Sequence, residues 1–470
     1  LPFVFHLHIL FGIINNDMKN GESRMEQIKL IEKLLEIRKY KEIKEILKEM
    51  NDVDVAEMLE GFSDENMIRI FRLLPKDDAA DIFAYMSSDR EHALIDSLTN
   101  KELENIINDL YSDDVMELLE ELPANVVKRI IAASNPETRR DINHLLRYPE
   151  DSAGSNMNID FVDLRADMTV KEAIARIRRI GVDKETINTC YVIDNFRHLL
   201  GIVTLRKLVL SSQSALIEEI MNDNLITVHT MEDQEDVAHD FQKYDLTSMP
   251  VVDNENRLVG IITVDDIVDI MQEETTEDIE KMAAMVPSDK PYIKNGPFET
   301  FKKRIPWLLL LMISASITGK IIQGFEHALA GSVILTAFIP MLMDTGGNSG
   351  SQASVSIIRA LSLDEIKHSD IVKIVFKEFR VAILVGVTLA ACNFIKMMII
   401  DHVSIMIAAV VCLTLIVTVI IAKIVGCTLP ILADKLGFDP AVMASPFITT
   451  IVDALSLLIY FTIATNLLNL

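Results

Sequence analysis

The sequence predicts a multidomain membrane protein that combines an all-α superhelical N domain, a tandem pair of α/β domains and an all-α membrane domain of five transmembrane helices. Three observations support this fold class: helical periodicity with regular breaks over 26–150, an internal repeat over 151–275, and long apolar runs over 305–470. A length of 470 residues is enough for about three domains. Residues 276–304 are expected to connect the repeat to the membrane domain.

Charge is divided unevenly along the chain. The whole chain has 45 basic and 70 acidic residues, and 301–470 hold 12 and 10 of them, a net charge of 12 − 10 = +2. Residues 1–300 therefore hold 33 basic and 60 acidic residues, a net charge of −27, although 50% of the whole chain is hydrophobic. These figures exclude a simple soluble enzyme and a disordered chain. They also exclude nucleic acid as a partner, because so acidic a surface repels phosphate.

Residues 26–150 predict a stack of short helices. Apolar residues recur at helical spacing, and breaks recur at Pro75, Pro123 and Pro136, each with a carboxylate or amide nearby, which is typical of helix starts. Stacked short helices of this kind form a superhelical module. The preceding residues 1–25 are interpreted as an N-terminal extension, because their apolar stretch is too short to cross a bilayer and lacks the basic region of a signal peptide.

An internal repeat changes the hydrophobic period after residue 150. The segments YVIDNFRHLLGIVT and PVVDNENRLVGIIT match, and the separation from Asp194 to Gly201 equals that from Asp253 to Gly260. Each copy predicts two strands joined by a tight turn, with one helix before them and another after them. The repeat therefore predicts a β-α-β-β-α unit that occurs twice.

Five apolar runs in the last third of the chain are each long enough to cross the ~30 Å core of a bilayer. They cover residues 305–323, 329–361, 381–400, 403–432 and 441–470. Basic residues gather before the first run, between the second and third, and between the fourth and fifth. The positive-inside rule therefore predicts a multi-pass protein of the plasma membrane, with its N-terminal domains in the cytoplasm and its C-terminus outside.

A segment rich in glycine and amides interrupts the second run. Its notable positions are Gly346, Gly347, Asn348, Gly350 and Gln352. Unpaired backbone groups are costly in hydrocarbon, so the segment fits a water-filled path in which bare glycine carbonyls and the two amides offer oxygen to a cation. The alternative is close helix packing, because Gly346 and Gly350 form a small-xxx-small pair.

Asp453 is the second feature that interrupts the apolar pattern. It is the only acidic or basic side chain after Asp439, and a carboxylate within a span costs at least about 2.5 kcal/mol on insertion scales. One interpretation is a protonated Asp that hydrogen-bonds to a neighbouring helix. The other is an ion site, in which the Asp453 side chains of a two-fold dimer face one divalent cation. Hydrated Mg²⁺ suits such a pair, because Mg²⁺ gives up its waters reluctantly.

Carboxylates are concentrated on the segment that joins the repeat to the first apolar run. Asp265, Asp266 and Asp269 are followed by further acids up to Glu280, on what should be one helix. Such a density repels itself without cations, although a solvated acidic face is the usual alternative. The position beside the membrane domain favours a sensor, in which cation binding compacts the cytoplasmic part and closes the path.

The repeat resembles a tandem cystathionine-β-synthase-type (CBS) pair. Together with the YPEDSAG segment that starts at Tyr148, the GGNSGSQ segment and Asp453 after two threonines, the sequence resembles the MgtE family of magnesium channels from about residue 53 to the end. The resemblance implies a homodimer with a helical N domain, a CBS pair, a connecting plug helix and a five-span pore. It also implies that cytosolic Mg²⁺ bridges the acidic faces and shuts the pore to its divalent cation substrate.

The resemblance assigns site residues by their position in the motifs. The pore carboxylate falls on Asp453, and the acid at the cytoplasmic mouth falls on Asp439, in an LGxDPA pattern. The metal-sensing acids of the CBS pair and its connection fall on Asp233, Glu235, Asp245, Asp266, Asp269, Glu274, Glu277 and Asp278. Their partners in the N domain fall on Asp81, Asp113 and Glu117. The expected pore lining is Gly346, Gly347, Asn348, Gly350, Gln352 and Thr449.

Two positions depart from the family pattern. Asp344 stands where a small residue is expected, and Ser445 replaces an Asn before the Pro of the last span. A different ligand is suggested by the CBS pair, since such pairs in related proteins bind adenine nucleotides. Asn188, Arg206 and Lys207 are therefore candidate contacts for ATP.

Two transport functions are compatible with the sequence. The first is a passive Mg²⁺ channel gated by Mg²⁺, and the second is a proton- or Na⁺-coupled secondary transporter of divalent cations such as Co²⁺, Ni²⁺ or Mn²⁺. The chain has no G-x-x-x-x-G-K-[ST] loop and no DKTG phosphorylation segment, which argues against an ATP-driven pump. It has no His–Glu zinc motif either, so no enzymatic activity is expected.

Overall fold

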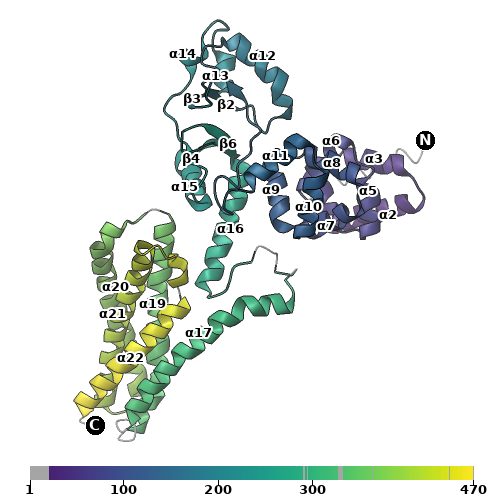
Figure 1. Cartoon of the computed structure of the whole chain (residues 1–470). Helices are drawn as coiled ribbons and strands as arrows, with labels where there is room; N and C mark the ends of the chain where they lie inside the picture. The colour runs from purple at the N-terminus through teal and green to yellow at the C-terminus, as the bar shows by residue number, and fades with distance from the viewer. Residues whose placement is uncertain are drawn as a thin grey trace. The chain divides into compact units, whose positions relative to one another are not determined.

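The computed structural model of the chain describes residues 21–288, 292–293, 295–326, 332–363, 365–443 and 445–468. Most of the predicted N-terminal extension, residues 1–20, lies outside these ranges. The chain divides into two units, Leu1–Val268 and Asp269–Leu470, and each unit has its own buried core (Figure 1).

Short helices build the N domain, as the sequence predicts. They are α2 (Gly21–Glu36), α3 (Tyr40–Lys48), α4 (Asp52–Leu59), α5 (Asp64–Phe71), α6 (Lys76–Ala84), α7 (Ser88–Ser97), α8 (Asn100–Asp109), α9 (Ser112–Glu121), α10 (Ala124–Ala133) and α11 (Pro136–Leu145). The helices α6 and α10 begin directly after Pro75 and Pro123. Pro136 occupies the first turn of α11, where the Asn135 side chain accepts the backbone N–H of Thr138 at 2.9 Å. The predicted breaks are therefore helix starts, and the all-helical N domain is confirmed.

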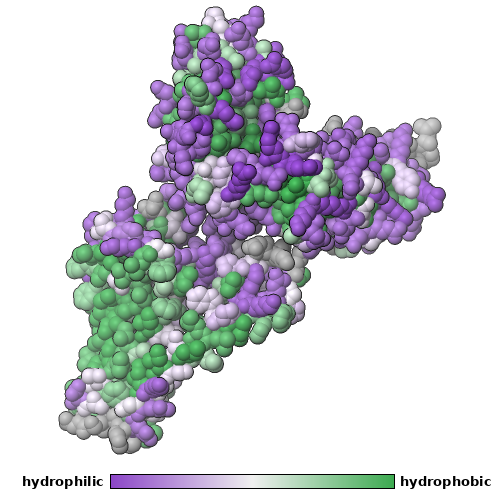
Figure 2. Space-filling model, viewed as in Figure 1, coloured by the Kyte–Doolittle hydropathy of each residue, from purple (hydrophilic) through white to green (hydrophobic). Residues whose placement is uncertain are grey.

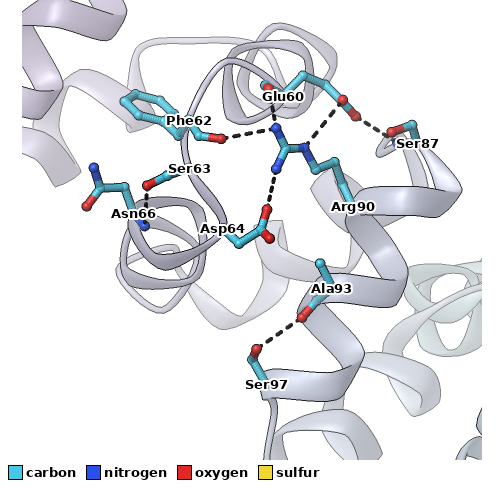
Figure 3. A network of polar contacts seen from close by, with 9 residues as sticks. All are labelled: Glu60, Phe62, Ser63, Asp64, Asn66, Ser87, Arg90, Ala93 and Ser97. Carbon is cyan, nitrogen blue, oxygen red and sulfur yellow. Dashed lines mark hydrogen bonds and ion pairs between the residues drawn. The ribbon is translucent and has the colours of Figure 1, made fainter. Parts of the chain in front are cut away.

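Arg90 of α7 forms hydrogen bonds with the turn between α4 and α5 (Figure 3). Its guanidinium donates to the carbonyl oxygens of Glu60 and Phe62 at 2.6 and 3.0 Å, and to the Asp64 carboxylate at 2.6 Å. The Glu60 carboxylate accepts the backbone N–H of Ser87 at 3.1 Å, just before α7 begins. Because the Arg90 side chain is only 22% exposed, it satisfies carbonyls at the end of α4 that water reaches poorly.

Replacing Arg90 by Ala is expected to destabilise residues 21–268 by about 1.5–3 kcal/mol, because partly buried carbonyls lose a charged donor. Urea unfolding of this unit, followed by circular dichroism, measures the change. Arg69→Ala is the matched control, since Arg69 pairs with Glu65 where the side chains are 58% and 75% exposed, and such a pair contributes less than about 0.5 kcal/mol. Equal losses in the two variants would contradict the role given to Arg90.

Two copies of one α/β unit follow the N domain. The first contains β1 (Asp163–Leu164), α12 (Val170–Ile180), η1 (Gly181–Asp183), β2 (Thr189–Ile193), β3 (Leu199–Thr204) and α13 (Leu205–Leu210). The second contains α14 (Ile217–Ile220), β4 (Val228–His229), α15 (Gln234–Tyr244), β5 (Ser248–Val252), β6 (Leu258–Thr263) and α16 (Val264–Met282). In both sheets the first strand is parallel to the second and the second is antiparallel to the third. The predicted β-α-β-β-α repeat is confirmed, and the acids from 265 to 280 lie on one helix, α16.

The structure explains why the same residues occur at matching positions of the two copies. The Asp194 carboxylate closes the β2–β3 turn by accepting the backbone N–H groups of Phe196 and His198 at 2.7 and 2.9 Å. Asp253 does the same in the β5–β6 turn. A Cβ added at Gly201 would lie 2.7 Å from the Met221 Sδ and 3.1 Å from the Asn222 carbonyl oxygen, so a larger residue would displace these neighbours.

The C-terminal unit consists of long helices with a hydrophobic surface (Figure 2). The elements are α17 (Pro297–Gly324), η2 (Val333–Phe338), α19 (Ile339–Ser362), η3 (His368–Asp370), α20 (Ile371–Ile399), α21 (Ile405–Lys435), η4 (Pro440–Met443) and α22 (Ser445–Leu468). Among the described residues, four helical segments are long and apolar enough to cross a bilayer: Pro297–Gly324, His368–Ile399, Ile405–Lys435 and Pro440–Leu468. The predicted number of five spans is therefore not confirmed. The helix α19 is 24 residues long, but its glycines and amides lower its hydropathy.

Candidate ion path and sensor sites

The glycine-rich segment lies inside α19, which is an unbroken α-helix that packs against α21 and α22 (Figure 1). The expectation of bare glycine carbonyls is therefore wrong, because a continuous helix engages them in its own hydrogen bonds. Gly346, Gly347 and Gly350 are buried and serve close packing instead. A Cβ added at Gly347 would lie 2.9 Å from the Thr449 Cγ2, and a Cβ added at Gly346 would lie 2.9 Å from the Ser456 Oγ.

A polar stripe runs along the exposed side of α19. Asp344, Asn348 and Gln352 are exposed and follow one another at intervals of four residues, so they share one face of the helix. Asp344 lies close enough to Asp453 of α22 for their charges to interact. This stripe and Asp453 together form a row of oxygen-bearing side chains.

Asp453 is half-buried on α22, one turn after Thr449. The Thr449 hydroxyl donates to the Pro446 carbonyl oxygen at 2.9 Å, which fixes its orientation. Within the described part of the chain, no basic side chain forms an ion pair with Asp453. No cation from the described residues therefore neutralises its charge.

The predicted pore-mouth acid, Asp439, is held by a lysine. The Lys281 Nζ lies 2.7 Å from an oxygen of Asp439 and 2.7 Å from one of Glu277, and the other Asp439 oxygen accepts the backbone N–H of Ala441 at 2.7 Å. Burial alone would lower the pKa of Lys281, but its bonds to Asp439 and Glu277 raise it above the ordinary lysine value. Burial, and next the charge of Asp439, raise the pKa of Asp278. Four charged groups thus meet where α16 approaches η4.

Sequence reasoning missed Lys281, although its spacing of four residues from Glu277 marks a helical ion pair. The partner Asp439 is far away in sequence and gives no local signal. The ammonium group of Lys281 lies between two carboxylates and reduces their repulsion, as a metal cation bound at the same point would.

Asp113 lies at a junction between the N domain and the first α/β unit. The Asn158 Nδ2 donates to both Asp113 oxygens at 3.0 and 2.9 Å and to Glu185 at 3.0 Å. Burial, and next the charges of Asp266 and Asp114, raise the pKa of Asp113 well above its usual range. Burial and then acidic neighbours also raise the pKa of Asp114 to about 6 and that of Glu185 to about 7. The carboxyl groups at this junction therefore repel one another when they are ionised.

The sequence predicted Asp113 and Asp266 at this junction but missed Asp114, Glu185 and Asn158. The predicted Asp81 is close enough to act on the charge of Asp114. The predicted Glu117 lines a small cavity of about 30 Å³ with Glu91 and Asp114. A cavity of that size holds about one water molecule.

Other predicted acids are spread along α15 and α16. Asp233 caps the start of α15 by accepting the Glu235 backbone N–H at 2.9 Å, whereas Asp245 ends the same helix in a left-handed conformation with φ 52°. The ends of this 11-residue helix are about 16 Å apart, so these acids do not converge. On α16, Glu274 shares one face with Glu277 and Asp278, while Asp269 lies on another. Among the described residues, no three His, Cys, Asp or Glu side chains meet closely enough to hold a metal ion.

The three candidate nucleotide contacts lie together at the start of α13. The Asn188 carbonyl oxygen accepts the backbone N–H of Leu205, the first residue of α13, at 2.9 Å. Arg206 and Lys207 follow and are exposed, and the Thr204 hydroxyl accepts the Lys207 backbone N–H at 3.3 Å. The arrangement presents two cations beside a helix N-terminus, which is a favourable place for phosphate.

A buried ion pair within the membrane domain was also missed. The Lys423 Nζ of α21 lies 3.5 Å from the Glu378 Oε2 of α20, and these side chains are only 6% and 14% exposed. Charged residues inside apolar spans carry a high cost, so the argument that singled out Asp453 applied equally to Lys423. The pair joins two spans that are adjacent in the chain.

Comparison with known proteins adds an independent finding. Residues 50–151 match the profile of the MgtE intracellular N domain, 156–213 and 217–273 each match the CBS domain, and 339–463 match MgtE, described as a divalent cation transporter. The magnesium transporter MgtE of Thermus thermophilus is 35% identical over 91% of this chain and 95% of its own length. The chain belongs to the MgtE family.

Further relatives agree with the family assignment. The magnesium transporter MgtE of Bacillus subtilis is 32% identical over 93% of this chain and 96% of its own. A crystal structure of the soluble part of a magnesium transporter is 28% identical, with a TM-score of 0.51, and covers 53% of this chain and 99% of its own. The predicted membership of the MgtE family and the CBS pair are thus confirmed. The matched profiles describe a transporter, its N domain and CBS domains, and none of them is catalytic.

Proposed function

We propose that this chain is a magnesium channel of the plasma membrane, which imports Mg²⁺ and closes when cytosolic Mg²⁺ binds its acidic faces. The observation that carries the proposal is Asp453, an uncompensated carboxylate beside the polar stripe of α19, in the part of the chain that matches a divalent cation transporter. Family members of this kind are named magnesium transporters, which supports Mg²⁺ as the substrate.

The proposed path runs along the polar stripe of α19 in a homodimer. Asp344, Asn348, Gln352 and Asp453 offer carboxylate and amide oxygens, which are the ligands that Mg²⁺ prefers. Asp453 from each of two subunits would place two negative charges at a two-fold axis, which match one dication. Among the described residues no three His, Cys, Asp or Glu side chains meet, which supports an ion that keeps its water shell and contacts Asp453 through water.

The proposed sensor consists of the carboxylates at the Asp113 junction and those on α16. The junction carboxylates repel one another and so oppose packing there; they are Asp113, Asp114, Glu185 and Asp266. A bound Mg²⁺ would attract all of them, so the net electrostatic contribution to packing would become favourable. At the end of α16, Lys281 already bridges Glu277 and Asp439, so Mg²⁺ would add to or replace a cation that the chain supplies. Cation binding can shift the gate only by the difference in affinity between the closed and open states.

The proposed orientation places the N domain and CBS pair in the cytoplasm, where the positive-inside rule puts them. The match of residues 50–151 to an intracellular domain supports this side. If α19 also crosses the membrane, the chain has five spans in total, and this odd number would leave the C-terminus outside. ATP is a proposed second ligand, held by its phosphates at Arg206 and Lys207 with Asn188 nearby.

A coupled transporter is the second candidate, and the closeness of Asp344 to Asp453 favours it. Two neighbouring carboxylates in a membrane can exchange a proton for a cation, so transport of Mg²⁺, Co²⁺, Ni²⁺ or Mn²⁺ would then follow a proton gradient. Flux in proteoliposomes separates the two functions. Flux that depends on membrane potential alone supports a channel, whereas flux that also follows a proton or Na⁺ gradient at fixed potential supports coupling.

Rescue of a bacterial strain that requires high external magnesium tests the proposal as a whole. Expression of the full chain is expected to restore growth at low Mg²⁺, because the protein supplies an import path. Failure to rescue, with the protein present in the membrane and folded, would contradict magnesium import.

The pH dependence of the sensor can be predicted from the raised pKa values. Asp114 and Glu185 hold protons in the folded unit at pH values where the unfolded chain has lost them, so their stabilising effect is present at low pH and is lost as the pH rises through about 6 and about 7. Without Mg²⁺, raising the pH from about 5.5 to about 7.5 is therefore expected to increase cleavage of residues 150–300 by an added protease. Millimolar Mg²⁺ is expected to suppress cleavage at the higher pH, because it neutralises the same carboxylates.

The matched variant for this experiment is Asp114→Asn/Glu185→Gln, which removes two of the three carboxyl groups with raised pKa values at the junction and leaves Asp113. Its cleavage is expected to change less with pH than that of the unaltered protein, after correction for the activity of the protease on an unfolded reference. Cleavage of the unaltered protein that is independent of both pH and Mg²⁺ would contradict the sensor.

A further inference from the structure

An apolar groove lies on α20 near its first residue. It is lined by Ile371, Val372, Val375, Phe376, Phe379 and Ile424, and its volume is about 470 Å³. The lining is wholly apolar, and Phe376 and Phe379 are exposed in the single chain. A groove of this size and lining fits a hydrocarbon chain and offers nothing to a polar ligand.

A row of basic side chains runs beside this groove. Lys373, Lys377 and Arg380 are exposed and lie at intervals of four and three residues, on one face of α20. The Arg380 guanidinium lies 4.9 Å from the centroid of the Phe376 ring, so the basic row adjoins the groove directly. Lys373 pairs with Asp370 at 2.7 Å, but within the described part of the chain no acidic side chain pairs with Lys377 or Arg380.

The length of α20 places both features at one surface of the membrane. Its 29 residues extend over about 43 Å, whereas the hydrocarbon core is about 30 Å thick, so about nine residues lie beyond it. The stretch 381–399 has Lys396 as its single charged residue, so the excess is the basic stretch 371–380. Helical side chains lean toward the N-terminus, which directs Lys377 and Arg380 toward the lipid headgroups.

We propose that this face of α20 binds an anionic phospholipid, with an acyl chain in the apolar groove and the phosphate between Lys377 and Arg380. Charge complementarity selects the occupant, because two cations that pair with no acidic side chain among the described residues attract a net negative lipid at headgroup level and give a zwitterionic one no advantage. Each basic group near an anionic membrane surface strengthens such attraction by about fivefold, so the pair is expected to favour phosphatidylglycerol over phosphatidylcholine by about 25-fold. The site goes beyond ion transport and does not depend on it.

The chain's single tryptophan, Trp307, makes the site accessible to fluorescence. In a Trp307→Phe background, Phe379→Trp places the single tryptophan of the full-length protein in the groove, where it can be excited selectively over tyrosine. Bilayers of phosphatidylcholine then receive either brominated phosphatidylglycerol or brominated phosphatidylcholine in equal amounts. Stronger quenching by the brominated phosphatidylglycerol is expected, and the concentrations needed for half-quenching give the selectivity.

The decisive comparison adds Lys377→Gln/Arg380→Gln, which is expected to reduce the selectivity from about 25-fold to about onefold. Lys435→Gln is the matched control, because this exposed lysine ends α21 outside the groove, and it is expected to keep the selectivity. Equal quenching by the two lipids, or selectivity that survives the double substitution, would overturn the proposal. Absence of quenching by either lipid, together with disulfide crosslinking of Phe376→Cys between two copies, would also overturn it, since the face would then be a contact between subunits.

Discussion

Asp453→Asn is expected to lower Mg²⁺ uptake by at least about 100-fold while leaving assembly and folding intact. The substitution preserves the shape of the side chain and removes the one charge on α22 that faces the polar stripe of α19. A factor of 100 corresponds to about 2.7 kcal/mol of lost stabilisation of the ion at the barrier. This loss is smaller than the attraction expected between a dication and the two Asp453 carboxylates of the proposed dimer in a poorly solvated path. Uptake of Mg²⁺ into proteoliposomes at fixed membrane potential measures the effect.

Two further variants give this experiment its controls. Asp370→Asn removes an acid that pairs with Lys373 at the edge of the membrane domain, and uptake is expected to stay near that of the unaltered protein. Asp344→Asn tests the neighbouring carboxylate, and a loss of proton-coupled flux with retained potential-driven flux would assign it to coupling. Undiminished uptake in Asp453→Asn would refute the proposed path.

Lys423→Met is expected to destabilise the membrane domain by about 3–5 kcal/mol, because it leaves the Glu378 carboxylate buried without its cation. The double variant Glu378→Gln/Lys423→Met is expected to regain most of that loss, since no uncompensated charge is then left. The cost of the single change lies in the unpaired charge and not in the small net energy of the pair. Thermal unfolding of the detergent-solubilised protein, followed by size-exclusion chromatography, measures the three species.

Lys396→Met serves as the control for this second prediction. Lys396 pairs with Asp401 at 3.0 Å near a helix end, and these side chains are 48% and 26% exposed, against 6% and 14% for Lys423 and Glu378, so the charge left unpaired is less buried. Its effect is expected to stay below about 1 kcal/mol. A double variant as unstable as Lys423→Met would show that Lys423 acts through packing and not through charge.

The parts of the fold that follow from local chemistry were predictable from the sequence. Pro136 with Asn135 starts a helix through φ restriction and capping, and both act within a few residues. Asp194 and Asp253 mark tight turns for the same local reason, so the repeat of α/β units could be aligned before any tertiary structure was known.

The contacts that give the candidate sites their electrostatics were not predictable, because they join distant parts of the chain. Asn158 reaches Asp113 across 45 residues, and Lys423 reaches Glu378 across another 45. No periodicity or motif encodes such partners, since each depends on how whole helices are placed. Lys281 shows the mixed case: its local partner Glu277 was visible in the spacing, whereas Asp439 was not.

The glycines of α19 show how composition misled the prediction. A segment of Gly, Asn and Ser suggests irregular backbone, because glycine is a weak helix former. In the structure the segment is helical, because the absence of side chains lets α19 pack closely against α21 and α22, and this packing outweighs the low propensity. The polar stripe could have been recognised from the four-residue interval between Asp344, Asn348 and Gln352.

A close contact between two helices of the membrane domain has a mechanical consequence. A Cβ added at Gly426 would clash with the Gly350 carbonyl oxygen, so the main chains of α19 and α21 touch with no side chains between them. Sliding of one helix past the other would need side-chain rotamers that can repack, and this crossing has none. The two helices are therefore expected to move together as one rigid body. In the proposed dimer, the width of a passage along α19 would then depend on the spacing between the two protomers, and the proposed gating would change that width by shifting whole subunits.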